Sequence, residues 1–160
     1  MYFAKPSKNY ISLVHPNELI HETLVLLSPS FKKDVVKLEE QLDPMLGLLS
    51  VDADLIKQVL VNLLLNAVQA LPPEGGTISV VTKQRVGGLE IVIQDTGMGI
   101  HPDHLSRIFD PFFTTKDRGT GLDLAVSHKV IEIHHGYLHV ESMVGSGSTF
   151  TIYLPYEGES

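Results

Sequence analysis

Amide side chains recur at a fixed spacing in the middle of the chain. Gln58, Asn62 and Asn66 follow one another at four-residue intervals among Leu, Val and Ala. On a helix, this spacing places all three on one polar line. Two interpretations of the asparagines are open: they hydrogen-bond neighbouring loops, because buried amides need partners, or they serve Mg²⁺ and phosphates. Magnesium prefers oxygen ligands and keeps several waters, so one amide oxygen with phosphate oxygens would be sufficient.

A second pattern follows an apolar run. Asp95-Thr96-Gly97-Met98-Gly99 combines a carboxylate with two closely following glycines. Alone, this pattern is that of a turn. If Asp95 is buried, however, its carboxylate can accept a hydrogen bond from the exocyclic amine of a base, and the glycines allow close backbone approach. Such an arrangement would select adenine.

Two further segments lie close together in the sequence. Phe109-Asp110-Pro111-Phe112-Phe113-Thr114-Thr115-Lys116 places three aromatic residues around a proline and ends in hydroxyls and an ammonium. It either anchors a loop or forms the hinge of a lid that presents Lys116 to phosphate. Gly119-Thr120-Gly121-Leu122 precedes a predicted helix, whose free N–H groups and positive end favour an anion. The G-x-x-x-x-G-K-[ST] phosphate-binding loop does not occur in the sequence.

Composition restricts the classes of function. The chain has 160 residues, 43% hydrophobic and 19% charged, as expected for one globular domain. Its formal net charge of −7 argues against binding to a nucleic-acid backbone, but not against a nucleotide, which needs only a few donors. Cysteine is absent, which excludes disulfides and thiolate metal sites. Polar residues interrupt both the start of the chain and its most apolar stretch, so we expect no secretory signal, membrane span or membrane contact.

Hydrophobic periodicity and turn residues predict the elements that position these motifs. Helical spacing predicts helices over residues 16–27, 52–71 with Asp52 as the N-cap, 103–109 and 121–134. Alternation predicts strands over residues 10–14, 35–42, 46–51, 77–84, 89–94, 137–143 and 148–154. We expect an α+β two-layer sandwich, with a mixed sheet of about five strands and about three main helices on one face. The irregular stretch 95–119 is long and predicts a functional loop or flexible lid.

Taken in order, these segments resemble a known family. N-L-L-L-N-A, D-T-G-M-G-I, F-D-P-F-F-T-T-K and G-T-G-L are similar to the N, G1, F and G2 boxes of histidine kinase ATP-binding domains. The ending G-S-G-S-T-F-T-I-Y-L-P is also typical of that family, and the similarity covers residues 10–155. The short loop between Lys116 and Gly119, with N-A-V-Q-A after the N box, most resembles the nitrogen-regulation type of sensor kinase.

The resemblance implies a fold shared with gyrase, heat-shock chaperone and mismatch-repair ATPases, and it implies ATP and Mg²⁺ as ligands. Asn66 would bind Mg²⁺, Asp95 would bind the adenine amino group with help from Thr149, and Lys116 would act at the phosphates. Asn62, Asn66 and Lys116 are the implied catalytic residues. The implied nucleotide site comprises Asn62, Asn66, Asp95, Gly97, Gly99, Ile100, Phe112, Thr115, Lys116, Gly119, Thr120, Gly121, Leu122 and Thr149.

The implied activity is transfer of the γ-phosphoryl group of ATP to a histidine, in two-component signal transduction. ATPase relatives carry a water-activating glutamate four residues before the magnesium asparagine, whereas this chain has Asn62, which cannot act as a base near neutral pH. We therefore expect weak hydrolysis. The acceptor histidine is expected on a separate dimerisation domain, because His21-Glu22 lies in this domain's own first predicted helix and lacks the rest of the acceptor motif. A superfamily ATPase is an alternative.

One residue departs from the family pattern. Family members usually read G-T-G-L-G-L, but here Asp123 replaces the third glycine. A carboxylate about 5 Å from a phosphate costs roughly 3 kcal/mol at an effective dielectric near 20. Either Asp123 weakens nucleotide binding and leaves a docking module, or its side chain points to solvent at little cost.

The remaining expectations concern organisation. Residues 1–9 are expected to be a linker from the dimerisation helices, residues 10–155 the catalytic domain, and residues 156–160 a tail. We expect the domain alone to be monomeric and cytoplasmic, in a parent kinase that membrane helices could anchor, and to have a response regulator as a partner. The eight histidines lack the company of a zinc site, so we expect them to be solvated or packed rather than metal-binding.

Overall fold

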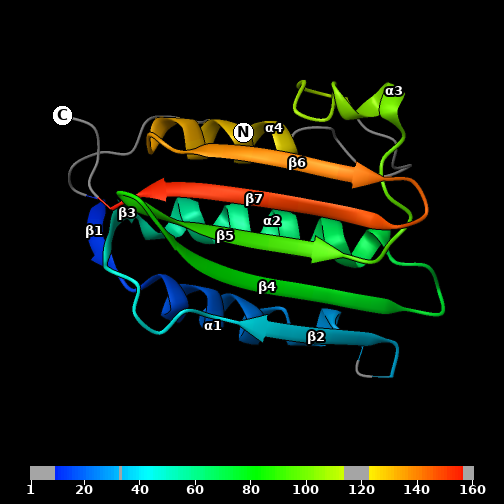
Figure 1. Ribbon diagram of the computed structural model, residues 1–160, viewed down its shortest axis with the longest axis horizontal. Helices are drawn as coiled ribbons and strands as arrows, with labels where there is room; N and C mark the ends of the chain where they lie inside the picture. Colours follow the sequence, from blue (N-terminus) through cyan, green and yellow to red (C-terminus); the bar gives the residue numbers. More distant parts are fainter. Residues whose placement is uncertain (1–9, 33, 114–122, 157–160) are drawn as a thin grey trace.

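A mixed five-stranded sheet forms one layer of the molecule (Figure 1). The computed structural model describes residues 10–32, 34–113 and 123–156. The strands lie in the order β2 (Val36–Gln41), β4 (Gly76–Arg85), β5 (Gly88–Asp95), β7 (Gly147–Pro155) and β6 (Tyr137–Met143). Strands β2 and β4 are parallel, and the other neighbours are antiparallel. The predicted mixed sheet is therefore confirmed.

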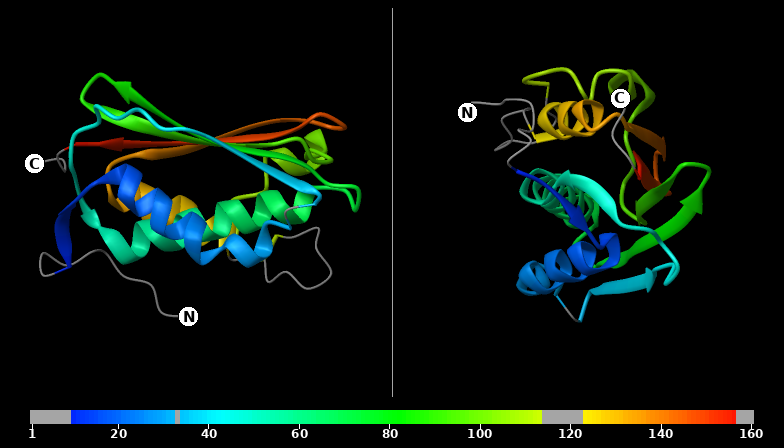
Figure 2. Two further views of the ribbon diagram at one scale, coloured as in Figure 1. Left: turned by 90° about the horizontal axis from the view of Figure 1, so that it is seen from below. Right: turned by 90° about the vertical axis from the view of Figure 1, so that its left-hand side faces the viewer.

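Three helices cover one face of this sheet, and no helix among the described residues covers the other face (Figure 2). They are α1 (Pro16–Leu26), α2 (Ala53–Ala70) and α4 (Asp123–Ile133), and α2 lies between the other two. A 3-10 turn, Ser28–Ser30, follows α1. The short helix α3 (Pro102–Leu105) lies near the outer end of β6 and is shorter than the predicted 103–109. The two-layer prediction is confirmed.

Local sequence signals set the ends of α2, the helix that carries Gln58, Asn62 and Asn66, which we call the amide line. The Asp52 side chain accepts from the N–H groups of Asp54 and Leu55, at 3.1 and 3.2 Å, and so satisfies donors that lack an intrahelical partner. The helix ends at Ala70, since Leu71 is extended ahead of Pro72 and a residue before proline avoids the helical region. These boundaries agree closely with the predicted 52–71.

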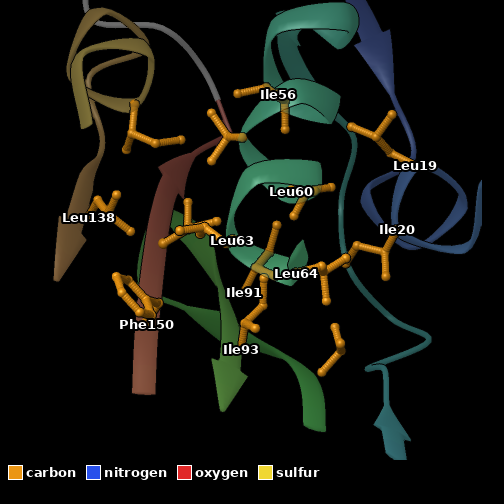
Figure 3. Close-up of a cluster of buried hydrophobic side chains, with 14 of the residues drawn as sticks. Leu19, Ile20, Ile56, Leu60, Leu63, Leu64, Ile91, Ile93, Leu138 and Phe150 are labelled. Atoms are coloured by element: carbon orange, nitrogen blue, oxygen red, sulfur yellow. The ribbon is translucent and has the colours of Figure 1, made fainter. Parts of the chain in front are cut away.

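Alternation along the strands directs one row of apolar side chains toward the helices. Ile91 and Ile93 of β5 and Phe150 of β7 lie on this face, where they pack against Leu63 and other residues of α2 (Figure 3). All of these side chains are almost completely removed from water. Burial of each contributes on the order of 1.5–3 kcal/mol, so the core fixes α2 firmly over the sheet.

A separate two-stranded sheet joins β1 (Ile11–Val14) to β3 (Leu49–Asp52) in antiparallel register. The predicted strand over 46–51 was wrong at its start, because β1 offers only four residues for pairing. Side chains hold the preceding segment instead: Asp43 Oδ1 accepts from Met45 N at 2.8 Å, and Gly47 N donates to the Tyr156 hydroxyl at 3.3 Å. Tyr156, expected in the tail, is thus packed against the domain.

Across the described segments, no helix has the length and apolarity that a membrane crossing requires.

Candidate active site

Asp95 is a buried carboxylate at the end of β5. It is 2% exposed because its side chain points toward the helix layer, as do Ile91 and Ile93 on the same strand. Its Oδ1 accepts from Gly97 N at 2.8 Å. Burial raises the pKa of Asp95 above its ordinary value of 3.8, while backbone hydrogen bonds from Gly97 and Ser148 partly oppose the rise.

Two glycines allow the loop after Asp95 to pack against its neighbours. A Cβ on Gly97 would lie 2.4 Å from the carbonyl oxygen of Ala70, at the end of α2. Gly99 has a φ of +77°, and a Cβ there would lie 2.3 Å from the Met143 carbonyl oxygen. Only glycine fits both positions without displacing backbone.

Hydrogen bonds tie the same loop to α2 and to the β6–β7 turn. Met98 N donates to Ala70 O at 3.0 Å, and Gly145 N donates to Met98 O at 2.8 Å. The amide of Ile100, an expected nucleotide contact, donates to Ser142 Oγ at 2.7 Å. The loop that follows Asp95 is therefore hydrogen-bonded to α2 on one side and to β6 and the β6–β7 turn on the other. These bonds restrict the position of the Asp95 carboxylate.

Thr149 does not lie beside Asp95. Asp95 is paired with Ser148, whereas Thr149 is paired with Gln94, and successive residues of a strand face opposite sides of the sheet. The expectation that Thr149 assists the adenine contact is therefore corrected, because its side chain faces the open side of the sheet. The residue on the correct face is Ser148, which is buried and lies 3.0 Å from the Ser142 hydroxyl. The alternation Phe150, Ile152, Leu154 could have revealed this register in the sequence.

The amide line of α2 runs from this loop toward α4. Asn66 lies one helical turn before Ala70 and is half-buried. Asn62, one turn earlier, donates from Nδ2 to Ser127 Oγ at 3.2 Å and to Asp123 O at 3.4 Å. The structure thus places the loop after Asp95 at Ala70, the end of α2, with Asn66 about one helical turn and Asn62 about two turns before it. Ser127 was not anticipated from the sequence, because nothing local marks it.

The aromatic segment of the predicted lid contacts α4 and the residues that follow α3. Phe109 stacks on His128 of α4 with ring centroids 4.7 Å apart, and the guanidinium of Arg107 lies 4.6 Å from the Phe113 ring centroid. Phe112 instead has a φ of 68° and is 73% exposed, so the structure does not place it among the buried site residues.

The remaining predicted residues lie outside the described part of the chain. They are Thr115, Lys116, Gly119, Thr120, Gly121 and Leu122. Asp123, the first described residue of α4, is exposed.

Two histidines have hydrogen bonds that give them structural roles. His134 is buried, its Nε2 accepts from Asp52 N at 3.1 Å, and its Nδ1 lies 2.8 Å from Val130 O. The ring is therefore neutral, with its proton on Nδ1, and burial lowers the pKa of His134. His101 Nδ1 accepts from Asp103 N at the start of α3. In the residues that the structure describes, no group of three or more His, Cys, Asp or Glu side chains could hold a metal ion.

The donor set fits a magnesium nucleotide. A carboxylate has about four acceptor positions, and the backbone donors at Asp95 leave capacity for an amine N–H. The amide of Asn66, on the same side of α2, offers an oxygen ligand of the kind that Mg²⁺ accepts.

Comparison with known proteins identifies the family of the chain. Residues 51–158 match the model of the family described as histidine kinase-, DNA gyrase B- and HSP90-like ATPase. The sensor histidine kinase ZraS of Escherichia coli (strain K12) is 42% identical over 152 residues, which cover 95% of the chain and 32% of ZraS. The histidine kinase AtoS of the same organism is 42% identical over 154 residues, covering 96% of the chain and 25% of AtoS. The chain thus spans about a third or less of these relatives.

A solved structure of the catalytic domain of histidine kinase ThkA superimposes with a TM-score of 0.82 and 31% identity, covering 91% of the chain and 95% of that domain. A second ThkA structure, in complex with the response regulator TrrA, superimposes with a TM-score of 0.78 and 28% identity, covering 92% of the chain and 42% of ThkA. The chain belongs to the histidine kinase-, DNA gyrase B- and HSP90-like ATPase family and, within it, is a histidine kinase ATP-binding catalytic domain.

Proposed function

We propose that this domain binds Mg²⁺-ATP and transfers the γ-phosphoryl group to a histidine on a separate dimerisation domain, as a protein histidine kinase. The observation that carries the proposal is the buried Asp95 carboxylate at the end of the α2 amide line. The matched family and the similarity to catalytic domains of histidine kinases support it further.

The proposal gives each of these residues a role. Asp95 accepts from the adenine amino group, and Gly97 and Gly99 allow the base to approach the backbone. Ser148 replaces Thr149 beside this contact, because it shares the face of Asp95. Asn66 supplies an oxygen to Mg²⁺, which neutralises phosphate charge during transfer. Lys116 and the G2 glycines are assigned to the phosphates.

Asn62 disfavours hydrolysis as the main reaction. Its NH₂ group donates to α4, and an amide has no basic lone pair with which to deprotonate water. Transfer to an imidazole needs no such base on the domain, since the attacking nitrogen carries its own lone pair. Positioning and charge neutralisation then supply most of the rate enhancement.

The partners are the dimerisation domain that bears the acceptor histidine and a response regulator. The ThkA–TrrA complex supports the second assignment by similarity. Action in the cytoplasm, within a parent that membrane helices could anchor, is part of this proposal.

Calorimetric titration of the chain with Mg²⁺ and a non-hydrolysable ATP analogue tests the first half. We expect saturable binding of the analogue. An excess of GTP should compete only weakly, because Asp95 distinguishes the amine of adenine from the carbonyl of guanine. Failure to bind the analogue would contradict the proposal.

Phosphotransfer itself is tested by mixing the chain with the histidine-bearing domain of its own parent kinase and ATP labelled at the γ-phosphate. We expect an acid-labile, base-stable phosphoprotein. Steady phosphate release without labelling would indicate an ATPase instead.

A further inference from the structure

Ser127 is a buried hydroxyl at the contact between α4 and α2. It is 0% exposed and lies one turn after Asp123, on the side of α4 that faces α2. Its Oγ accepts from Asn62 Nδ2 at 3.2 Å. A buried hydroxyl in an apolar contact is unfavourable unless it is hydrogen-bonded, so the pairing with Asn62 accounts for its presence there.

The chemistry of the neighbouring atoms fixes which end of the Asn62 amide faces α4. Asp123 O, at 3.4 Å from Nδ2, is a backbone carbonyl oxygen and can only accept. Turning the amide over would bring two acceptor oxygens together. The NH₂ group must therefore point toward α4, whatever names the amide atoms carry.

This orientation decides what Asn62 offers to the site. With its donors used by α4, Asn62 presents its carbonyl oxygen, an acceptor, to its remaining surroundings. Phosphate oxygens are also acceptors and gain nothing from that group, whereas the waters that Mg²⁺ retains are strong donors. The amide oxygen of Asn62 is therefore suited to the hydrated metal rather than to phosphate.

We propose that Ser127 is a positioning residue that holds the Asn62 amide with its oxygen directed toward the hydrated Mg²⁺ of the bound nucleotide. The inference rests on the proposed function and adds a residue of α4 to it. It assigns Asn62 to the hydrated metal instead of to the phosphates.

The metal dependence of nucleotide affinity separates positioning from packing. Titrate a non-hydrolysable ATP analogue into the wild-type chain and Ser127→Ala, with Mg²⁺ and then with EDTA. Loss of one neutral hydrogen bond predicts affinity about three- to tenfold weaker with Mg²⁺. The affinity in EDTA is expected to be unchanged. Equal losses in both conditions, or none with Mg²⁺, would overturn the inference.

A matched control removes another buried hydroxyl from a helix. Thr23 on α1 is also 0% exposed, and its Oγ1 donates to Leu19 O within the same helix at 2.8 Å. Thr23→Val should leave the metal dependence unchanged. In the Asn62→Ala background, adding Ser127→Ala should have no further effect on it, and a further loss there would show that Ser127 does not act through Asn62.

Two readouts keep the inference distinct from the proposed function. If the wild-type chain binds no analogue, the proposed function fails. If it binds and Ser127→Ala retains full metal dependence, only the inference fails. In the ligand-free protein, we expect the side-chain amide protons of Asn62 to have shifted NMR signals and slow exchange with water. In Ser127→Ala, these signals should move to the chemical shifts of exposed amides. Unchanged signals would contradict the positioning role.

Discussion

At the scale of single residues, Asp95 is subject to two opposing influences. Burial favours its neutral form, whereas N–H groups from Gly97 and Ser148 favour the carboxylate. An amine from a bound base would add another donor and shift the balance toward the ionised form. Burial of the Asp95 charge therefore costs free energy in the ligand-free domain, and we expect an added amine donor to reduce that cost.

Replacement of Asp95 by Asn tests this role. The substitution keeps the size of the side chain but removes its charge, and loss of a charge-assisted hydrogen bond is worth about 1.5–3 kcal/mol. We expect nucleotide affinity to fall about ten- to a hundredfold. Calorimetry measures the change, with the exposed Asp103→Asn as the control. Unchanged affinity would exclude Asp95 from the contact.

His134 gives the domain a specific sensitivity to acid. Because burial lowers the pKa of His134 in the folded state, the unfolded chain binds its proton first as the pH falls. The contribution of neutral His134 to the free energy of unfolding is complete above the unfolded pKa of about 6.5. As the pH falls from there toward the lowered folded pKa, this contribution decreases by up to about 1.4 kcal/mol per pH unit.

Urea unfolding between neutral and mildly acidic pH checks this expectation. His134→Gln keeps an acceptor for the N–H of Asp52 but cannot be protonated. The variant should lose less stability than the wild type across that range, since all other histidines are shared. Parallel losses in both proteins would show that His134 is not responsible.

At the scale of secondary structure, we expect Asp123 to act on α4 more than on the nucleotide. A carboxylate in the first turn interacts favourably with the helix dipole, and glycine is a poor helix former. Because Asp123 is exposed, water and salt screen its repulsion of phosphate.

We therefore expect Asp123→Gly to lower the free energy of unfolding by about 1 kcal/mol. The same substitution should raise nucleotide affinity by less than about fivefold, since an exposed pair interacts by roughly 1 kcal/mol at most. Urea unfolding and calorimetry measure the two effects. A gain near a hundredfold would show instead that Asp123 disables the phosphate end of the site.

Most elements could be predicted from the sequence because their signals are local. Strand β6 (Tyr137–Met143) has the predicted limits, since alternation and flanking glycines define it. Strand β3 begins later than expected because its limit depends on the length of β1, which is distant in sequence. The exchange of Thr149 for Ser148 arose from a register shift of one residue, which reverses the face of every side chain. The Asn62–Ser127 pair could not be predicted, because it depends on how two helices pack.

At the scale of the whole molecule, a single core couples the site to global stability. Leu63 is fully buried between α2 and the sheet, in the turn that follows Asn62. Leu63→Ala should destabilise the domain by about 2–5 kcal/mol, through lost transfer free energy and the cavity left behind. Thermal unfolding checks this, with the exposed Val86→Ala as the control. A loss equal to that of the control would mean that the helix layer is not held by this packing.

The position of β7 between β5 and β6 has a consequence for synthesis on the ribosome. Strand β6 is made before β7, yet among the described strands β6 pairs only with β7. Until the chain through Pro155 has left the exit tunnel, β5 and β6 both expose unpaired edges, and Ser148 cannot yet meet Asp95. A nascent chain stalled before Gly147 thus cannot complete the sheet, and we expect chaperones and proteases to act on it. We therefore expect the domain to bind nucleotide only after β7 has been made and has paired with β5 and β6.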